Sequence, residues 1–140
     1  MRVLIDTNVI LDVLTNREEF ADDAVKVFKL CEVRRLEGYI SALTLPNLVY
    51  IMRKELKREQ VKDVVEKLSL LFGIVDLREE DVKRAADMDI PDYEDALQCV
   101  QAARIKADFI VTRNLKDFKN SKVMAVKPSE LLERLDERSE

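Results

Sequence analysis

Histidine is absent from this chain of 140 residues, and cysteine occurs only twice. Without histidine the chain has no imidazole general base, no Ser-His or Cys-His nucleophile and none of the usual zinc sites. Cys31 and Cys99 form neither a CxxC pair nor the cysteine framework of a secreted protein. We therefore expect two reduced, buried thiols in a cytoplasmic protein. Carboxylates remain as the main source of chemistry.

Glycine and proline are also scarce, with 2 and 3 copies, whereas charged residues make up 37% of the chain. This composition favours helices joined by short loops. Apolar residues reach 47%, enough for a packed core, but no apolar run approaches the ~20 residues of a membrane span. The first residues, MRVLID, lead directly into a strand and lack the shape of a signal peptide. We expect one domain over residues 1–140.

The net charge of −4 at first argues against a nucleic-acid partner. The basic residues are nevertheless clustered, at positions 34–35, 53–54, 57–58, 104/106 and 113/116/119. If the acids are concentrated in a metal site, these clusters remain available to a phosphate backbone. The alternative is that each cluster is only the solvated face of a helix.

Short apolar runs alternate with helical patterns along the whole chain. The runs predict strands at residues 3–5, 39–42, 74–77, 109–112 and 123–126. The helical patterns follow residue 8 and cover about 20–35, 44–57, 59–71, 79–88, 92–106 and 130–138. We expect Thr44 to cap its helix, and Gly38 and Gly73 to end the helices before them. Such alternation predicts an α/β fold, a parallel sheet with helices on both faces.

Polar side chains follow the first and fourth predicted strands. Asp6 comes directly after the first strand, Asn114 and Asp117 follow the fourth, and Asp95 lies in the first turn of a helix. In a parallel sheet these positions meet beyond the carboxyl ends of the strands. Two carboxylates about 5 Å apart repel by ~3 kcal/mol at an effective dielectric constant near 20. Such crowding predicts a bound divalent cation that prefers oxygen ligands, as Mg²⁺ does.

Each of these positions also has a purely structural interpretation. Asp6 is a possible helix N-cap, and Asp92 with Asp95 a possible capping pair. We favour capping for Asp92 and an inward-facing ligand role for Asp95, because apolar Ala96 and Leu97 follow it. Asn114 suits a turn and Asp117 a solvated loop. The remaining early acids, Asp12 and Asp22–Asp23, have the pattern of charges on helix surfaces.

Three stretches resemble the PIN-domain nucleases, close to the VapC toxins of bacterial and archaeal toxin–antitoxin pairs. They are VLIDTNVILDVL (3–14), ISALTLPNLVYIMRK (40–54) and DYEDALQCVQAARIKADFIVTRNLKDF (92–118), and VKPSELL (126–132) also resembles the end of the family. The resemblance implies a three-layer α/β/α fold with a five-stranded parallel sheet in the order 3-2-1-4-5. It also implies an endoribonuclease that requires Mg²⁺ or Mn²⁺, forms a homodimer and is restrained by an antitoxin.

By the same resemblance, Asp6 and Asp95 are the two principal metal ligands. Asp117 and Asn114 match the region that completes the site, and Thr112 matches a residue that orients water. One position departs from the family, because Asn47 stands where an acid is common early in the helix after the second strand. This implies one negative charge fewer, and weaker binding of a second ion, reduced activity or no activity. Nearby, Arg113 or Lys116 is expected to bind flanking RNA phosphates.

Two other functions remain open. A catalytically weakened PIN-like protein, with Asn47 in place of an acid, would act as an RNA-binding or dimerisation module. A different acid-bearing α/β protein is the other possibility. Dehalogenase-like phosphatases need Asp-x-Asp after the first strand, but here the residues are Asp6-Thr7-Asn8. A response-regulator receiver needs a phosphoacceptor at the end of its central strand, for which Asp76 is the only candidate.

Overall fold

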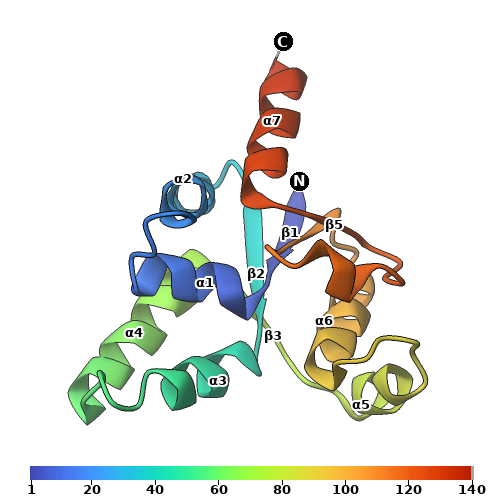
Figure 1. Cartoon of the computed structure of the whole chain (residues 1–140), viewed down its shortest axis with the longest axis horizontal. Coiled ribbons are helices and arrows are strands. Elements are labelled where there is room, and N and C mark those ends of the chain that lie inside the picture. Colours follow the sequence, from blue (N-terminus) through green and yellow to red (C-terminus); the bar gives the residue numbers. More distant parts are fainter. Residues whose placement is uncertain (140) are drawn as a thin grey trace.

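Five parallel strands form one sheet in the computed structural model, which describes residues 1–139, without the side chains of 137–139. The strand order is β3-β2-β1-β4-β5, so the predicted fold and order are confirmed (Figure 1). The strands are β1 (Arg2–Ile5), β2 (Glu37–Ser41), β3 (Gly73–Val75), β4 (Phe109–Val111) and β5 (Met124–Val126).

Within residues 1–139, six α-helices and one short 3₁₀ helix lie between the strands, and a seventh α-helix follows β5. They are α1 (Thr7–Leu14), α2 (Ala21–Glu32), α3 (Thr44–Ile51), α4 (Arg58–Leu71), α5 (Glu79–Ala86), α6 (Tyr93–Arg104), η1 (Leu115–Phe118) and α7 (Pro128–Ser139). None of the helices within this part of the chain is both long and apolar enough to cross a membrane.

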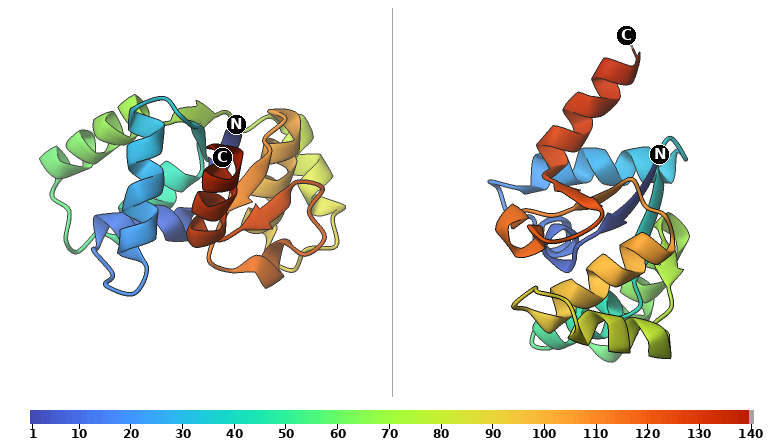
Figure 2. Two further views of the ribbon diagram at one scale, coloured as in Figure 1. Left: turned by 90° about the horizontal axis from the view of Figure 1, so that it is seen from above. Right: turned by 90° about the vertical axis from the view of Figure 1, so that its right-hand side faces the viewer.

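Helices cover both faces of the sheet, and successive side chains of β1 point to opposite faces. Val3 and Ile5 pack on one side with residues of α1, α2, α3, α4 and α7. Leu4 packs on the other side with residues of α5 and α6. Figures 1 and 2 show the same division, with the sheet between the two groups of helices. The layers explain why β1 is apolar at every position from 3 to 5.

The prediction that Gly38 and Gly73 end the preceding helices is wrong, because both glycines belong to strands. Gly38 lies inside β2 and Gly73 begins β3, and neither has a positive φ. A Cβ atom at Gly38 would lie 2.6 Å from the Cys31 Sγ and 2.8 Å from the Phe72 ring. The glycine is therefore needed for close packing of α2 against the sheet, not for ending a helix.

The predicted cap and length of α3 are also wrong. Leu43 occupies the N-cap position, and Thr44 is the first helical residue. The Thr44 hydroxyl instead lies 2.9 Å from the Thr7 hydroxyl, which joins α3 to α1. The helix ends at Ile51 rather than near residue 57. The role of Thr44 depends on a contact with a residue distant in sequence, and the residues around Thr44 do not predict that contact.

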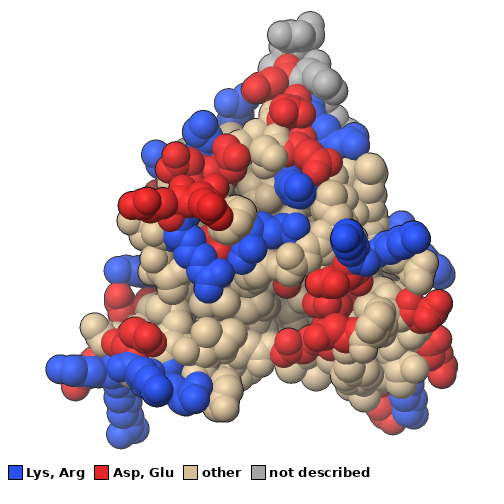
Figure 3. All heavy atoms as spheres, in the orientation of Figure 1, with Lys and Arg blue, Asp and Glu red and all other residues tan. Residues whose placement is uncertain are grey.

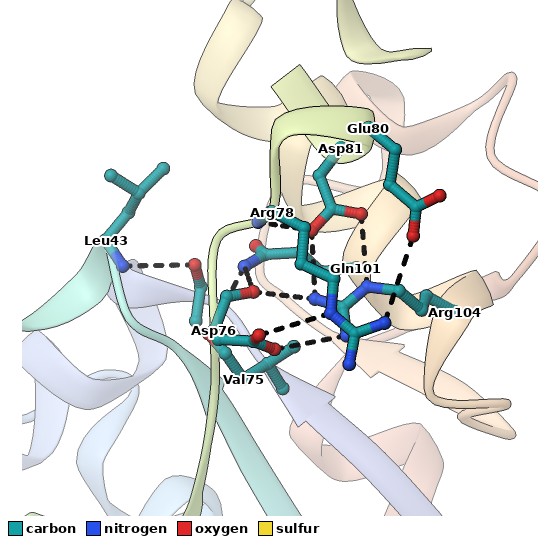
Figure 4. A network of polar contacts seen from close by, with 9 residues as sticks. Leu43, Val75, Asp76, Arg78, Glu80, Asp81, Gln101 and Arg104 are labelled. Atoms are coloured by element: carbon teal, nitrogen blue, oxygen red, sulfur yellow. Dashed lines mark hydrogen bonds and ion pairs between the residues drawn. The ribbon is translucent and has the colours of Figure 1, made fainter. Parts of the chain in front are cut away.

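Side chains of α6 fix this helix against the end of β3 (Figure 4). The Gln101 Nε2 donates to the carbonyls of Val75 and Asp76, at 3.3 and 3.1 Å. The Arg104 guanidinium donates to the buried Asp81 carboxylate at 2.9 Å and forms an ion pair with Asp76 at 3.1 Å. Because α6 cannot slide along the sheet without breaking these contacts, its first turn is held at the carboxyl edge.

Candidate metal-binding and catalytic site

The carboxyl ends of β1 and β4 place two polar residues side by side. Ile5 pairs with Val111 in the parallel register, so Asp6 and Thr112 are the next residues on each strand. The Asp6 amide donates to the Val111 carbonyl at 2.9 Å. These backbone contacts position the Asp6 and Thr112 side chains without the help of a ligand.

Asp6 is almost fully buried, with 6% of its surface exposed. It occupies the N-cap position of α1, but its carboxylate makes no cap hydrogen bond. Instead, the two oxygens accept hydrogen bonds from the Gln98 Nε2 at 3.0 Å and the Thr112 Oγ1 at 2.8 Å. Burial raises the pKa of Asp6, and these two hydrogen bonds partly oppose that rise. The capping interpretation of Asp6 therefore holds for its backbone alone.

Asp95 is half-buried near Asp6, and its pKa is raised to about 7. Burial is the largest cause, followed by the charges of Asp92, Asp6, Asp117 and Glu94. The Asp117 charge also raises the pKa of Asp6. The three acids singled out from the sequence thus lie close enough to repel one another.

Asp92 and Asn114 support the backbone around these acids. The Asp92 carboxylate accepts a hydrogen bond from the Asp95 amide at 3.1 Å, which confirms the capping interpretation of Asp92. The backbone N–H of Asn114 donates to the Thr112 Oγ1 at 3.1 Å. Thr112 therefore fixes the Asp6 carboxylate and the following turn at the same time.

Two polar residues of the site were missed by sequence reasoning. Gln98 is 5% exposed, and its Oε1 has no hydrogen-bond partner. Asn8 donates to the Thr112 Oγ1 at 3.5 Å, and its buried Oδ1 also lacks a partner. For Gln98 a signal existed, because Gln98 and Gln101 are the only polar residues in the buried run from Ala96 to Ala102, apart from Cys99. A buried polar group in an apolar run requires a specific partner.

Asn47 lies on the opposite side of the site, where α3 faces the start of α6. Its Nδ2 donates a hydrogen bond to the Glu94 carboxylate. Asn47, Glu94 and Gln98 line one small recess together with Thr7 and Thr44. The amide that replaces an expected acid is thus in direct contact with an acid from another helix.

Arg113 pairs with a different acid, Asp12 of α1. Its Nε lies 2.6 Å from the Asp12 Oδ2, and its guanidinium packs on the Phe20 ring at 4.3 Å. Asp12 is 1% exposed, so the expectation that Asp12 is a helix-surface charge is wrong. Asp12 lies on the amphipathic helix α1. Its cationic partner, Arg113, comes from a distant segment, so the sequence of α1 does not reveal the pair. Lys116 is exposed on η1, next to Asp117.

The residues present fit a hydrated divalent cation. Among the side chains that the structure describes, no three acids or cysteines stand close enough together to enclose a metal ion. Mg²⁺ nevertheless keeps several waters and needs only one or two carboxylates, and oxygen ligands suit Mn²⁺ as well. Asp6 and Asp95 offer such carboxylates. Burial is the main cause of their raised pKa values, and repulsion from the Asp117 charge adds to both. A cation would relieve that repulsion.

The surface around the site is divided by charge. In Figure 3, acidic side chains gather over α6 and the turn after β4, beside a hollow below the sheet. The helices form two lobes, one of α1–α4 and one of α5 and α6 (Figure 1). Basic side chains gather at the tip of the α1–α4 lobe, over the connection between α3 and α4 (Figure 3). The exposed basic residues there are Arg53, Lys54 and Lys57 of the connection and Arg58, the first residue of α4.

Comparison with known proteins agrees with this architecture. The chain is 23% identical over 137 residues to Ribonuclease VapC1 of Aquifex aeolicus, and the alignment covers 95% of this chain and 94% of that protein. Its fold matches that of a solved VapBC2 complex from Rickettsia felis, bound to a promoter DNA fragment. The TM-score is 0.69 at 19% identity, covering 91% of this chain and 98% of the other.

A second solved structure, FitAcB from Neisseria gonorrhoeae, gives a TM-score of 0.67 at 22% identity, with the same coverage of 91% and 98%. These likenesses concern the fold, because the identities are low. The family model of the PIN domain matches residues 2–116, which include β1 through η1 up to Lys116. The chain therefore belongs to the PIN-domain family.

Proposed function

We propose that this protein is an endoribonuclease that depends on Mg²⁺ or Mn²⁺ and serves as the toxin of a toxin–antitoxin pair. The observation that carries the proposal is the crowding of Asp6, Asp95 and Asp117 at the carboxyl edge of the sheet. Such crowding is unfavourable without a cation or added protons. The similar Aquifex aeolicus protein is described as a ribonuclease, which supports RNA as the substrate.

Each side chain has a defined role in this proposal. Asp6 and Asp95 hold the ion, and the contacts of Thr112 and Gln98 keep the Asp6 carboxylate oriented. Asp117, which is exposed, completes the site through water.

When bound, the cation supplies Lewis-acid polarisation of the scissile phosphate and lowers the pKa of a water molecule. Asn114 would orient that water, and Lys116 would bind a flanking phosphate. The resemblance implies a water-orienting role for Thr112 as well, but this residue is buried and its hydroxyl already bonds Asp6, the backbone N–H of Asn114 and Asn8. Its role in this proposal is therefore to hold Asp6. Arg113 is a weaker candidate for phosphate binding, because its Nε is already paired with Asp12.

The test is cleavage of a single-stranded RNA by the purified chain in Mn²⁺, with a DNA of the same sequence as the comparison. We expect RNA cleavage that EDTA abolishes. Asp6→Asn should lower the rate by about a hundredfold or more, since a lost metal function amounts to several kcal/mol. The matched control is Asp22→Asn, at an exposed acid of α2. Cleavage that is equal in Asp6→Asn, or that persists in EDTA, would end this proposal.

The partners belong to the same proposal. One structural relative, from Klebsiella pneumoniae, is described as a toxin–antitoxin complex, which supports an antitoxin as the protein that restrains this chain. We propose a homodimer that acts in the cytoplasm, where its RNA substrate is present. Expression of the chain alone should arrest growth, and co-expression with the product of the adjacent gene should relieve the arrest. Light scattering should give twice the mass of one chain.

A second candidate function is a non-catalytic RNA-binding or dimerisation module. The observation that favours it is the neutral Asn47 at the edge of the site, in contact with Glu94. This candidate requires that the unaltered chain binds RNA without cutting it in Mn²⁺. Metal-dependent cleavage by the unaltered chain excludes it.

The phosphoacceptor interpretation of Asp76 is disfavoured. Asp76 follows β3, which is an edge strand of the sheet rather than the central one. Its carboxylate pairs with Arg78 at 3.2 Å and with Arg104 at 3.1 Å. The Arg78 hydrogen bond is the main cause that lowers the pKa of Asp76. Acetyl phosphate should therefore leave the chain unlabelled.

A further inference from the structure

Glu94 reaches from the first turn of α6 to the first turn of α3. Its carboxylate accepts a hydrogen bond from the Asn47 Nδ2, although 47 residues separate the two positions in sequence. The side chain is exposed, so this hydrogen bond, rather than tight packing, sets its direction. This amide donor occupies one oxygen of the carboxylate, so the second oxygen remains available to another partner.

The orientation of Gln98 supplies an independent observation. The Gln98 Nε2 donates to the Asp6 carboxylate at 3.0 Å, so the NH₂ group of Gln98 faces Asp6. The Gln98 Oε1 then points elsewhere, is buried, and has no partner in the structure. Gln98 and Glu94 line the same small recess. A buried oxygen acceptor requires a donor or a cation, and no side chain that the structure describes donates to the Gln98 oxygen.

We propose that Glu94 is a cation-positioning residue, which supplies from α6 the negative charge that Asn47 does not supply from α3. Asn47 holds the Glu94 carboxylate in place, and Gln98 links the recess to the buried Asp6. The carboxylate acts on the ion through water, since the described acids form no closed metal cage. This inference rests on the metal-dependent activity proposed above. It predicts an active enzyme despite the neutral residue at position 47.

The direct test is titration of Mn²⁺ into the full chain, followed by calorimetry. Glu94→Gln keeps the size of the side chain and an oxygen that accepts from Asn47, but removes the charge. We expect it to weaken Mn²⁺ binding by about 10- to 100-fold, the usual loss for residues that orient a metal site. The control is Glu59→Gln, at an exposed glutamate in the first turn of α4, which should bind Mn²⁺ like the unaltered chain.

A charge swap separates a cation-positioning role from a structural one. The double variant Asn47→Glu with Glu94→Gln returns the charge to α3 and should recover most of the Mn²⁺ affinity lost in Glu94→Gln. Asn47→Ala should also weaken Mn²⁺ binding, because it releases the Glu94 carboxylate. A purely structural role for Glu94 predicts no recovery in the double variant.

Equal Mn²⁺ affinity in Glu94→Gln and the unaltered chain would overturn this inference while leaving the ribonuclease proposal intact. An unaltered chain that binds no Mn²⁺ and cuts no RNA would overturn both. Weakened Mn²⁺ binding in Glu94→Gln together with recovery in the swap supports the inference.

Discussion

At the scale of single residues, the site combines unfavourable charge with specific support. Burial and neighbouring negative charges raise the pKa of Asp95 to about 7, far above its ordinary value of 3.8. Asp6 is more deeply buried, and Gln98 and Thr112 hold its carboxylate. Residues that weaken a fold in this way are typical of functional sites.

The first prediction concerns the stability of the metal-free protein as a function of pH. Because the folded chain holds the Asp95 proton more tightly than the unfolded chain, protonation of Asp95 favours folding. The stabilising effect is fully present below pH 3.8 and is lost as the pH rises through about 7. Asp95→Asn should remove this loss. Asp95 is partly exposed, so we expect a gain at neutral pH on the order of 1 kcal/mol.

Thermal denaturation in EDTA across this pH window measures the effect. Asp63→Asn, at an exposed acid of α4, is the matched control and should show the pH profile of the unaltered chain. An Asp95→Asn protein with that same profile would show that Asp95 has an ordinary pKa.

At the scale of elements, α6 is the part of the fold that carries the site. It holds Asp95, Glu94 and Gln98, and its other end is fixed by Gln101 and Arg104 against the end of β3. The same helix thus connects a stabilising polar network at one end, shown in Figure 4, to a destabilising cluster of acids at the other.

The second prediction tests this anchoring. Arg104→Ala leaves the carboxylate of Asp81, which is 1% exposed, without its guanidinium partner. We expect a loss of about 3 kcal/mol in the free energy of unfolding, as for other broken buried ion pairs. Urea denaturation measures it, with exposed Arg84→Ala on α5 as the control. Similar losses in both variants would mean that the network does not anchor α6.

At the scale of the whole molecule, the site exists only where two lobes and the sheet meet. Asp6 and Thr112 come from the central strands, Asn47 from the lobe of α1–α4, and Asp95 from the lobe of α5 and α6 (Figure 1). A cation bound there would join all three parts, so binding should stabilise the folded chain as a unit.

The third prediction follows from this linkage. Mn²⁺ at about one hundred times its dissociation constant should add about 2.7 kcal/mol to stability. For a chain of this size that corresponds to a rise in Tm of about 5–10 °C. Asp6→Asn should show no such rise, whereas Asp22→Asn should behave like the unaltered chain. Equal rises in Asp6→Asn and the unaltered chain would place the ion elsewhere.

The sequence by itself determined the strands, the order of elements and the positions of Asp6 and Asp95, because apolar periodicity and strand ends are local patterns. Tertiary structure alone decided three other points. Arg113 buries Asp12, Gln98 turns toward Asp6, and Glu94 meets Asn47. Each joins segments that are distant in sequence. Their pairing depends on how helices rotate and settle on the sheet, and no local pattern records that.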